Sequence, residues 1–206
     1  MLILLRHGES VWNADDRFAG WTDVPLSEVG RKEAAGAGAS LARSGCLPDV
    51  VHTSLLRRAI STAAIALDVA DRHWIPVRRD WRLNERNYGA LEGRSREEVR
   101  AQYGDEQFTT WRRSYSVAPP AGESLEDVLA RLLPYWETAV AADLRAGRTV
   151  LVVSHGNVLR TLISHFEGLP PRSITVPSGE PFGYELTEEL QPVGGRRFLS
   201  TDRRTQ

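Results

Sequence analysis

Sulfur chemistry is nearly absent from this chain, which has a single cysteine, Cys46, among 206 residues. One thiol cannot form a disulfide within the chain and cannot hold a metal ion alone, so a disulfide framework and a cysteine-bound metal centre are excluded. We interpret Cys46 as a small filler near a turn rather than as a catalytic thiol. The expected setting is therefore reduced and cytoplasmic.

The chain also lacks a large excess of charge of one sign, and it has no long apolar run. The formal net charge is -1, which gives no support to binding of nucleic acid or a membrane surface through the overall field. The apolar run over residues 2–5 is too short for a signal peptide or a membrane span. Lysine is also scarce, because all of the 26 basic residues except Lys32 are arginine. Arginine binds phosphate and carboxylate through two parallel hydrogen bonds, so these numbers are compatible with a local cationic pocket.

Three short apolar runs, over residues 2–5, 50–51 and 149–153, each lead into polar residues. Unbroken apolar runs are typical of strands buried on both faces, as in a parallel sheet. Helical patterns follow them over 27–43, 55–69, 124–146 and 157–167, with Ser27, Ser54 and Ser124 as candidate N-caps and a kink or break expected at Pro134. The alternation predicts an α/β fold, a three-layer α/β/α sandwich with a mainly parallel central sheet.

The length fits one domain, which we place over residues 1–190. Residues 82–120 are rich in Arg, Tyr, Trp and Gly and lack a strand pattern. We expect them to form a helical insertion or cap over the carboxyl-terminal edge of the strands. Residues 191–206 are expected to form a mobile C-terminal tail.

Two of the predicted strands end in a His-Gly pair, at His7-Gly8 and at His155-Gly156. Side chains at the carboxyl ends of parallel strands face the ligand crevice, so these histidines would converge if their strands are adjacent. Glycine after each histidine permits a sharp turn and a close backbone approach. A helix beginning near Asn157 would direct the positive end of its dipole to the same place, which favours an anion there.

Arginines beside the first pair suggest phosphoryl chemistry. A neutral imidazole is a good nucleophile near neutral pH, and nearby guanidinium groups favour the neutral form. Arg6 supplies one such group, and Arg57 and Arg58 could supply another at the start of the second helix. These groups would also neutralise a phosphoryl group in transfer. A lone Arg-His-Gly or Ser-His-Gly triplet is a weak signal, but the two strand-end His-Gly pairs together with Arg57 and Arg58 are a stronger one. His52, His73 and His165 lack such neighbours and are interpreted as structural or surface residues.

Longer motifs around these residues carry a resemblance to a known family. They are LLRHGES (4–10), RFAGW (17–21), DVPLSEVG (23–30), LNERNYGALEG (83–93) and SHGNVLR (154–160). Together they resemble the histidine phosphatase superfamily and, within it, the cofactor-dependent phosphoglycerate mutases. The similarity runs from about residue 2 to residue 190.

The resemblance implies a role for each matching position. His7 would be the nucleophile that becomes phosphorylated, and Glu85 the general acid/base that handles the substrate hydroxyl proton. Arg6, Arg58 and His155 would surround the phosphoryl group. The expected substrate-binding residues are Asn13, Gly20, Tyr88, Arg96, Arg112, Arg113 and Asn157. No metal is implied, because no clustered ligands with suitable spacing are present.

Three departures from the family pattern bear on the activity. Ala19 stands where Thr or Ser is usual, so one hydroxyl contact is missing. Arg96 stands where Lys is usual, which keeps the charge and changes its shape. The chain also lacks a segment near Pro120 and has a brief tail after Leu190. A looser closure of the site could favour hydrolysis over transfer.

The leading hypothesis is interconversion of 3-phosphoglycerate and 2-phosphoglycerate through a phosphohistidine at His7, primed by 2,3-bisphosphoglycerate. One alternative is a phosphatase of the same fold that acts on another small phosphorylated metabolite. An alternative of another class is a non-catalytic sensor of a phosphorylated ligand. The expected partners are a small phosphorylated acid and, because family members are commonly dimers or tetramers, further copies of the chain; no nucleic acid or membrane is expected.

Overall fold

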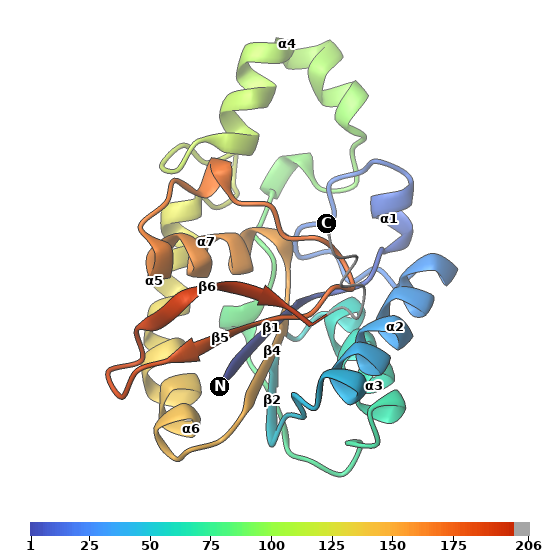
Figure 1. The fold of residues 1–206 in the computed structure, drawn as a ribbon. Coiled ribbons are helices and arrows are strands. Elements are labelled where there is room, and N and C mark those ends of the chain that lie inside the picture. Colours follow the sequence, from blue (N-terminus) through green and yellow to red (C-terminus); the bar gives the residue numbers. More distant parts are fainter. Residues whose placement is uncertain (200–206) are drawn as a thin grey trace, which may run out of the picture.

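A computed structural model describes residues 1–199 and contains one mixed sheet of six strands in the order β3-β2-β4-β1-β5-β6 (Figure 1). The inner strands β2, β4 and β1 and the edge strand β3 run parallel, whereas β5 is antiparallel to β1 and β6 is antiparallel to β5. The strands are β1 (Leu2–Arg6), β2 (Val50–Thr53), β3 (Val77–Arg79), β4 (Val150–Ser154), β5 (Phe182–Leu186) and β6 (Pro192–Phe198).

Helices cover both faces of this sheet, and the predicted α/β/α sandwich is therefore confirmed (Figure 1). On one side lie α2 (Glu28–Ser44) and α3 (Arg57–Val69); on the other lie α5 (Leu125–Tyr135), α6 (Ala141–Arg145) and α7 (Gly156–Glu167). The shorter elements are α1 (Val11–Ala14), η1 (Trp81–Leu83), η2 (Gly89–Leu91) and η4 (Pro171–Ser173). Among the described residues, none of the helices has the length and apolar character needed to cross a bilayer.

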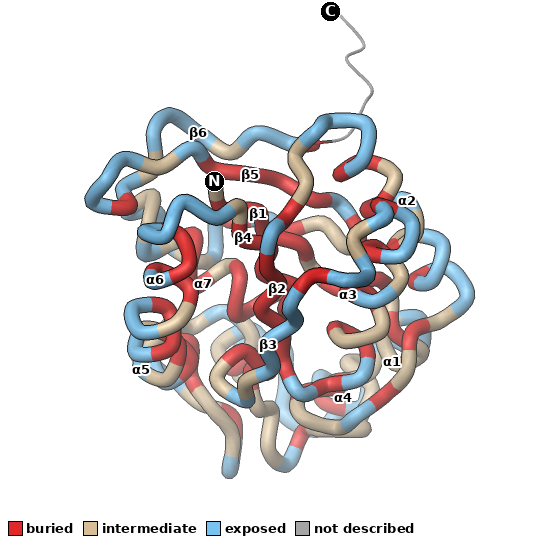
Figure 2. The backbone as a smooth tube through the Cα atoms, turned by 90° about the horizontal axis from the view of Figure 1, so that it is seen from below, coloured by how far each residue is buried: buried red, intermediate tan, exposed pale blue. Residues whose placement is uncertain are grey.

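Strand periodicity explains how β1 joins the two layers. Leu2 and Leu4 belong to the core cluster under α5 and α7, while Ile3 and Leu5 belong to the cluster under α2 and α3. All four side chains are fully buried, because successive residues of a strand point to opposite faces and both faces are covered. Figure 2 shows the same contrast across the sheet: the inner strands are buried, whereas β3 and much of β6 are exposed.

The predicted helix over 124–146 is interrupted after Pro134. The α-helix α5 gives way to a π-helical segment, η3 (Trp136–Val140), before α6 completes the run. Proline has no amide hydrogen to donate and its ring displaces the preceding turn, which is the expected cause of such an irregularity. The capping prediction at Ser124 is confirmed, because its hydroxyl accepts a hydrogen bond from the Asp127 amide at 3.1 Å.

The chain after residue 190 differs from the expected mobile tail. Residues 192–198 form β6, which pairs with β5 through antiparallel contacts such as Phe182 opposite Phe198. Gly194 and Gly195 interrupt the side-chain pattern by which a strand is recognised in a sequence. The pairing of β5 with β6 also shifts register between Gly183 and Glu185, as at a β-bulge. Residues 200–206 of the predicted tail lie outside the described residues.

Residues 82–120 form the cap that extends beyond the carboxyl ends of the parallel strands (Figure 1). Its main element is α4 (Arg96–Arg113), which bends at Gly104, where φ is 80°. Four buried side chains of the cap, Leu91, Val99, Phe108 and Trp111, form a small cluster with Phe18 from the N-terminal part of the chain. The cap is thereby held as a unit over the edge of the sheet, as the sequence predicted.

A buried polar cluster, separate from this edge, ties β2 to the helical layer. His52 is fully buried, with Nδ1 at 2.8 Å from the Tyr135 hydroxyl and Nε2 at 2.9 Å from Asp143. Asp143 also accepts hydrogen bonds from Arg78 and Arg148. These buried contacts support the interpretation of His52 as a structural residue.

Two glycines of α2 give a matched stability test. A Cβ on Gly30 would lie 2.0 Å from the backbone oxygen of Glu9, whereas a Cβ on Gly36 would meet nothing within 4 Å. We expect Gly30→Ala to lower the free energy of unfolding by about 1 to 3 kcal/mol, because backbone must move. Gly36→Ala should raise it by about 0.5 to 1 kcal/mol through helix propensity. Urea unfolding of both variants checks this; equal effects would contradict the close packing of α2 on the loop after β1.

Candidate active site

The two predicted histidines meet at the carboxyl ends of adjacent parallel strands. β1 and β4 pair directly, with Arg6 opposite Ser154, so His7 and His155 each follow the end of a neighbouring strand. Their ring centroids are 4.9 Å apart, and both rings are buried. The convergence predicted from the two His-Gly pairs is therefore present.

Hydrogen bonds define the tautomer of His7. Its Nδ1 lies 2.6 Å from the backbone oxygen of Gly8. A carbonyl oxygen only accepts hydrogen bonds, so Nδ1 carries the proton and the lone pair resides on Nε2. The backbone of Gly8 therefore leaves Nε2 as the nucleophilic atom of the ring.

His155 is fixed by Ser54, which the sequence suggested only as a helix cap. The Ser54 hydroxyl lies 2.8 Å from His155 Nε2, and its oxygen accepts a hydrogen bond from the Leu56 amide. The N-cap position of α3 is Leu56, without a side-chain cap, so the capping prediction for Ser54 is wrong. The buried His155 Nδ1 has no hydrogen-bond partner among the described residues.

Arg6 and Arg58 flank the two histidines from different layers. Arg58 is 1% exposed, and its guanidinium donates to the backbone oxygens of Thr22 at 3.0 Å and Gly20 at 2.7 Å. Arg6 donates to Val176 O at 3.0 Å, while its buried Nε has no partner among the described residues. Arg57, in contrast, is exposed and does not line the cavity. Of the predicted Arg57-Arg58 pair, only Arg58 contributes to the site.

Burial and these arginines act together on the histidines. The pKa of His7 lies well below its ordinary value of 6.5, first because burial disfavours the charged ring and then because Arg58 and Arg6 repel a further positive charge. The pKa of His155 is lowered in the same way by burial and then by Arg58 and His7. Sequence reasoning attributed the neutral form to the arginines alone; burial is the larger cause.

Glu85 faces the same cavity from the cap side. Its Oε1 accepts hydrogen bonds from the amides of Arg86 at 2.8 Å and Asn157 at 3.2 Å, the latter at the N-terminus of α7. No hydrogen bond to its second oxygen, Oε2, is made by the described residues. A carboxylate held by one oxygen, with the other unpaired at a cavity, is arranged to exchange a proton with a ligand.

The loop around Gly20 is held by a carboxylate that the sequence did not single out as a site residue. Glu92 accepts hydrogen bonds from the amides of Trp21, Thr22 and Tyr88. Gly20 has φ 49°, and a Cβ there would lie 2.0 Å from Glu92 Oε1. The close approach requires glycine at position 20 and fixes the carbonyl that Arg58 binds.

The cavity measures about 340 Å³ and is lined by eleven of the twelve predicted site residues. His155 is the exception, because it is fully buried behind the wall, next to His7. The lining residues among the predictions are Arg6, His7, Asn13, Gly20, Arg58, Glu85, Tyr88, Arg96, Arg112, Arg113 and Asn157.

Contacts between the lining residues join the cap to the sheet layers. Asn157 donates through Nδ2 to the Tyr88 hydroxyl at 3.0 Å and accepts from Arg160 at 2.8 Å. Arg96 pairs with Asp16, and the Arg112 guanidinium lies over the Phe108 ring. The residues far apart in the sequence thus form one continuous cationic wall.

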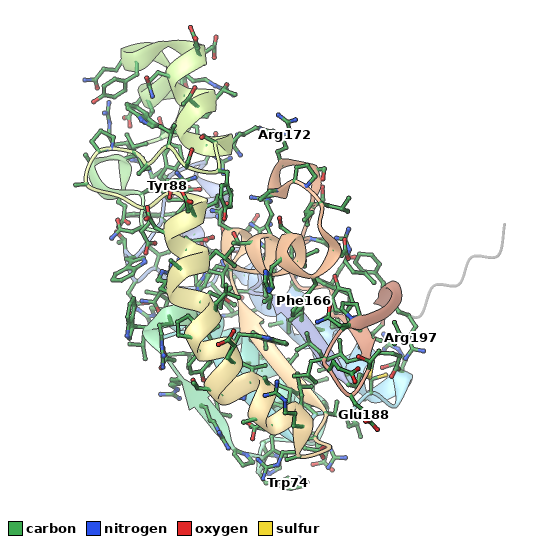
Figure 3. All side chains as sticks on the ribbon, turned by 90° about the vertical axis from the view of Figure 1, so that its left-hand side faces the viewer. Trp74, Tyr88, Phe166, Arg172, Glu188 and Arg197 are labelled. Carbon is green, nitrogen blue, oxygen red and sulfur yellow. The ribbon has the colours of Figure 1, made fainter. Side chains whose placement is uncertain are left out.

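Three arginines that line the cavity were not predicted as site residues, namely Arg17, Arg160 and Arg172. Arg17 and Arg160 are within motifs that the resemblance covers, but nothing about their spacing marks them as cavity residues. Arg172 lies on η4, after two prolines. Figure 3 places Arg172 and Tyr88 at the end of the molecule covered by α4, on separate segments.

Metal binding finds no support in the side chains that the structure describes. Among residues 1–199 there is no group of three or more His, Cys, Asp or Glu side chains that could hold a metal ion. The cavity is lined by arginine and by the single carboxylate of Glu85. Such a donor set suits anions rather than cations.

The buried histidines predict a loss of stability in mild acid. Folding keeps His7 and His155 neutral, because their pKa values lie well below 6.5, while the unfolded chain takes up protons near 6.5. Their stabilising contribution is present above that pH and is lost as the pH falls. We expect the free energy of unfolding to drop by about 2 kcal/mol between pH 6.5 and 5.5.

Urea unfolding at several pH values measures this dependence. His7→Gln removes one of these groups and should reduce the drop by about 1 kcal/mol. The exposed residue His73 gives the matched control, since His73→Gln should leave the pH dependence unchanged. A free energy that is flat between pH 6.5 and 5.5 would show that the rings are not held neutral.

Comparisons with known proteins agree with this geometry. Residues 2–180 match the model of the histidine phosphatase superfamily (branch 1). A protein of Nocardioides sp. is 52% identical over an alignment 229 positions long, which covers 98% of this chain and 93% of the relative. One of Rhodococcus jostii is 52% identical, covering 98% of this chain and 91% of the relative. Both are named 2,3-bisphosphoglycerate-dependent phosphoglycerate mutase.

Among solved structures, a mycobacterial glucosyl-3-phosphoglycerate phosphatase in complex with VO3 superposes with a TM-score of 0.77 at 29% identity, covering 96% of each chain. The match therefore extends to the fold as well as to the motifs. On the family match, the identity to its relatives and the paired histidines, this chain belongs to the histidine phosphatase superfamily, branch 1.

Proposed function

We propose that the protein interconverts 3-phosphoglycerate and 2-phosphoglycerate through a phosphohistidine at His7. The observation that carries this proposal is the meeting of His7, Arg6, Arg58 and Glu85 around one cavity, with the His155 ring next to that of His7. The names of relatives about half identical over nearly the whole chain support the same activity.

The residues divide the chemistry between a nucleophile and a proton carrier. When His7 is phosphorylated, Glu85 takes the proton of the substrate's free hydroxyl, and that oxygen forms a bond to phosphorus as the phosphorus–Nε2 bond breaks. In the return step Nε2 attacks the phosphoryl group on the other carbon. The bond from that carbon's oxygen to phosphorus breaks, and Glu85 gives its proton to the departing oxygen.

Arg6 and Arg58 neutralise the phosphoryl oxygens during both steps. Their guanidinium groups are already held by backbone carbonyls, so they need little reorganisation when charge develops. The buried Nδ1 of His155, without a partner among the described residues, is suited to donate to one of these oxygens. His7 itself stays neutral and nucleophilic because its pKa is lowered by burial and by Arg58.

The residues present also fit 2,3-bisphosphoglycerate as the primer. This compound would supply the phosphoryl group that first loads His7. Eight arginines line the cavity against one carboxylate, Glu85, and buried donors on Arg6 and His155 lack partners among the described residues. Arg58, Arg6 and His155 would hold its transferred phosphoryl group, and Arg112 and Arg113 its remaining charge.

A phosphatase of the same fold is the second candidate, and Ala19 is the observation that favours it. Ala19 lines the cavity with no hydroxyl to offer a ligand. One of the solved structures that this chain resembles is a phosphatase. In that reaction His7, Arg6, Arg58, His155 and Glu85 keep their roles, and water accepts the phosphoryl group instead of a second hydroxyl.

One assay separates the two candidates. The purified protein is incubated with 3-phosphoglycerate, with and without 2,3-bisphosphoglycerate, while 2-phosphoglycerate and released inorganic phosphate are measured together. The proposal expects transfer to exceed hydrolysis by orders of magnitude and to depend on the primer. Brisk phosphate release without any 2-phosphoglycerate would overturn the mutase assignment in favour of the phosphatase.

The setting of this activity is inferred from the same sources. We infer that the enzyme works in the cytoplasm, where a small phosphorylated acid is its substrate and where Cys46 stays reduced. Family resemblance further suggests a dimer or tetramer. Light scattering during size-exclusion chromatography measures that state, and a monomer at micromolar concentration would contradict it.

A further inference from the structure

The arginines of the cavity differ in what already holds them. Arg6, Arg58 and Arg160 donate to backbone or side-chain oxygens of the protein, and Arg6 and Arg58 lie close enough to His7 to lower its pKa. Further out, Arg17 donates to Gly93 O at 2.7 Å. These groups are oriented by the protein before any ligand arrives.

Three cavity arginines have no hydrogen bond or ion pair within residues 1–199, namely Arg112 and Arg113 at the end of α4 and Arg172 on η4. Of these, Arg112 lies over the Phe108 ring. Arg113 and Arg172 are exposed and belong to different segments, Arg113 to the cap and Arg172 to the loop after α7. A guanidinium that lines a cavity without a protein partner has its five N–H donors available for a ligand.

The loop that carries Arg172 is fixed by hydrogen bonds from two other arginines of the site. Arg160 Nε donates to Ile174 O at 3.0 Å, and Arg6 donates to Val176 O at 3.0 Å. The side chains of Ile174 and Val176 are buried in the core. On the other side of Arg172, Pro170 and Pro171 restrict the backbone. The position of Arg172 at the opening is therefore set by two arginines of the inner site.

We propose that Arg172 determines substrate specificity. It would bind a second anionic group of the substrate, one that lies away from the phosphoryl group being transferred. This proposal rests on the proposed function, since it concerns the same cavity. The inner phosphoryl position already has His7, Arg6 and Arg58, whereas Arg172 and Arg113 are exposed and line the same cavity from separate segments. Together they select ligands that carry a second negative group, a carboxylate or a second phosphate, at the outer end.

Arg172→Ala tests the assignment by separating outer from inner binding. Loss of a charge-assisted contact is expected to raise the KM for 3-phosphoglycerate about tenfold, with kcat changed by less than about threefold. We expect inorganic phosphate to occupy the inner position, so its dissociation constant should stay within about twofold of the wild type. Arg172→Lys keeps the charge without the planar fork and should give an intermediate KM. Arg145→Ala, which removes an exposed arginine at the end of α6, is the matched control and should change neither value.

Two results would overturn the assignment. The first is a KM that stays within about twofold in Arg172→Ala. The second is equal weakening of 3-phosphoglycerate and inorganic phosphate, which would mean that Arg172 acts on the whole cavity through its charge or through loop structure. The dissociation constant of 3-phosphoglycerate, expected to rise about tenfold like its KM, and that of inorganic phosphate can both be measured without turnover. They therefore test Arg172 even if the wild type transfers no phosphoryl group; that failure would count against the proposed function instead.

Discussion

Replacing His7 by alanine is expected to lower kcat by at least about four orders of magnitude, the scale seen when the nucleophile of a covalent mechanism is removed. The reason is local: the hydrogen bond to the Gly8 carbonyl leaves the lone pair of His7 on Nε2, and among the described residues His7 is the one imidazole that lines the cavity. His155 cannot replace it, since its Nε2 is engaged by Ser54. Steady-state kinetics with 3-phosphoglycerate measure the loss.

The control for this experiment is His73→Ala, because His73 is exposed and lies outside the cavity. Its kcat should match that of the wild type. Binding of inorganic phosphate by His7→Ala, retained within about tenfold through Arg6 and Arg58, would show that the pocket is still formed. Residual turnover above one-hundredth of the wild-type rate would rule out His7 as the nucleophile.

Removal of the Arg58 guanidinium is expected to lower kcat/KM by roughly two to three orders of magnitude, the usual cost of losing a preorganised charge stabiliser. Arg58 is 1% exposed and lies between the loop around Gly20 and the two histidines. Arg58→Met retains much of the length and removes the charge, so it tests electrostatics with little loss of volume. Arg58→Lys should recover part of the activity, but one ammonium cannot bind the carbonyls of both Gly20 and Thr22 in the same geometry.

The neighbouring residue supplies the control. Arg57 has the same charge and is next in the chain, yet it is exposed and outside the cavity. Arg57→Met should change kcat/KM by less than about twofold. Equal losses in Arg57→Met and Arg58→Met would indicate a general effect of net charge on anion binding and would contradict a specific role for the buried guanidinium.

The central part of the fold could be predicted because burial leaves a simple pattern. Strands such as β1 are covered on both faces, so its residues 2–5 are all apolar and the run is recognisable. The same feature located the site: polar residues that directly follow such a run lie at the carboxyl end of the strand. His7 and His155 were therefore found without knowledge of their partners.

The edges of the sheet could not be predicted for the converse reason. β3 is exposed along all three residues, and β6 contains Gly194 and Gly195 and alternates little. Pairing with a neighbouring strand, rather than burial of their own side chains, determines these segments. The result is a sheet that continues past residue 190, where the sequence predicted that the domain ends.

The missed residues of the site share one property, which is that their role depends on tertiary contacts. Ser54 was a plausible N-cap by its position before a helix, yet its hydroxyl binds His155. Glu92 and Arg172 reach the site through loops whose course no local pattern indicates. Propensity and spacing place residues along the chain; only the packed fold decides what a loop side chain faces.

The most direct test of the account is detection of the phosphorylated enzyme. The protein is mixed with 2,3-bisphosphoglycerate, quenched in alkali, digested and analysed by mass spectrometry, with a parallel sample exposed to acid. The account predicts one phosphoryl group on the peptide that contains His7, stable in alkali and lost in acid, and none in His7→Ala. A phosphate that survives acid, resides on another residue or never forms while the wild type turns over would contradict it.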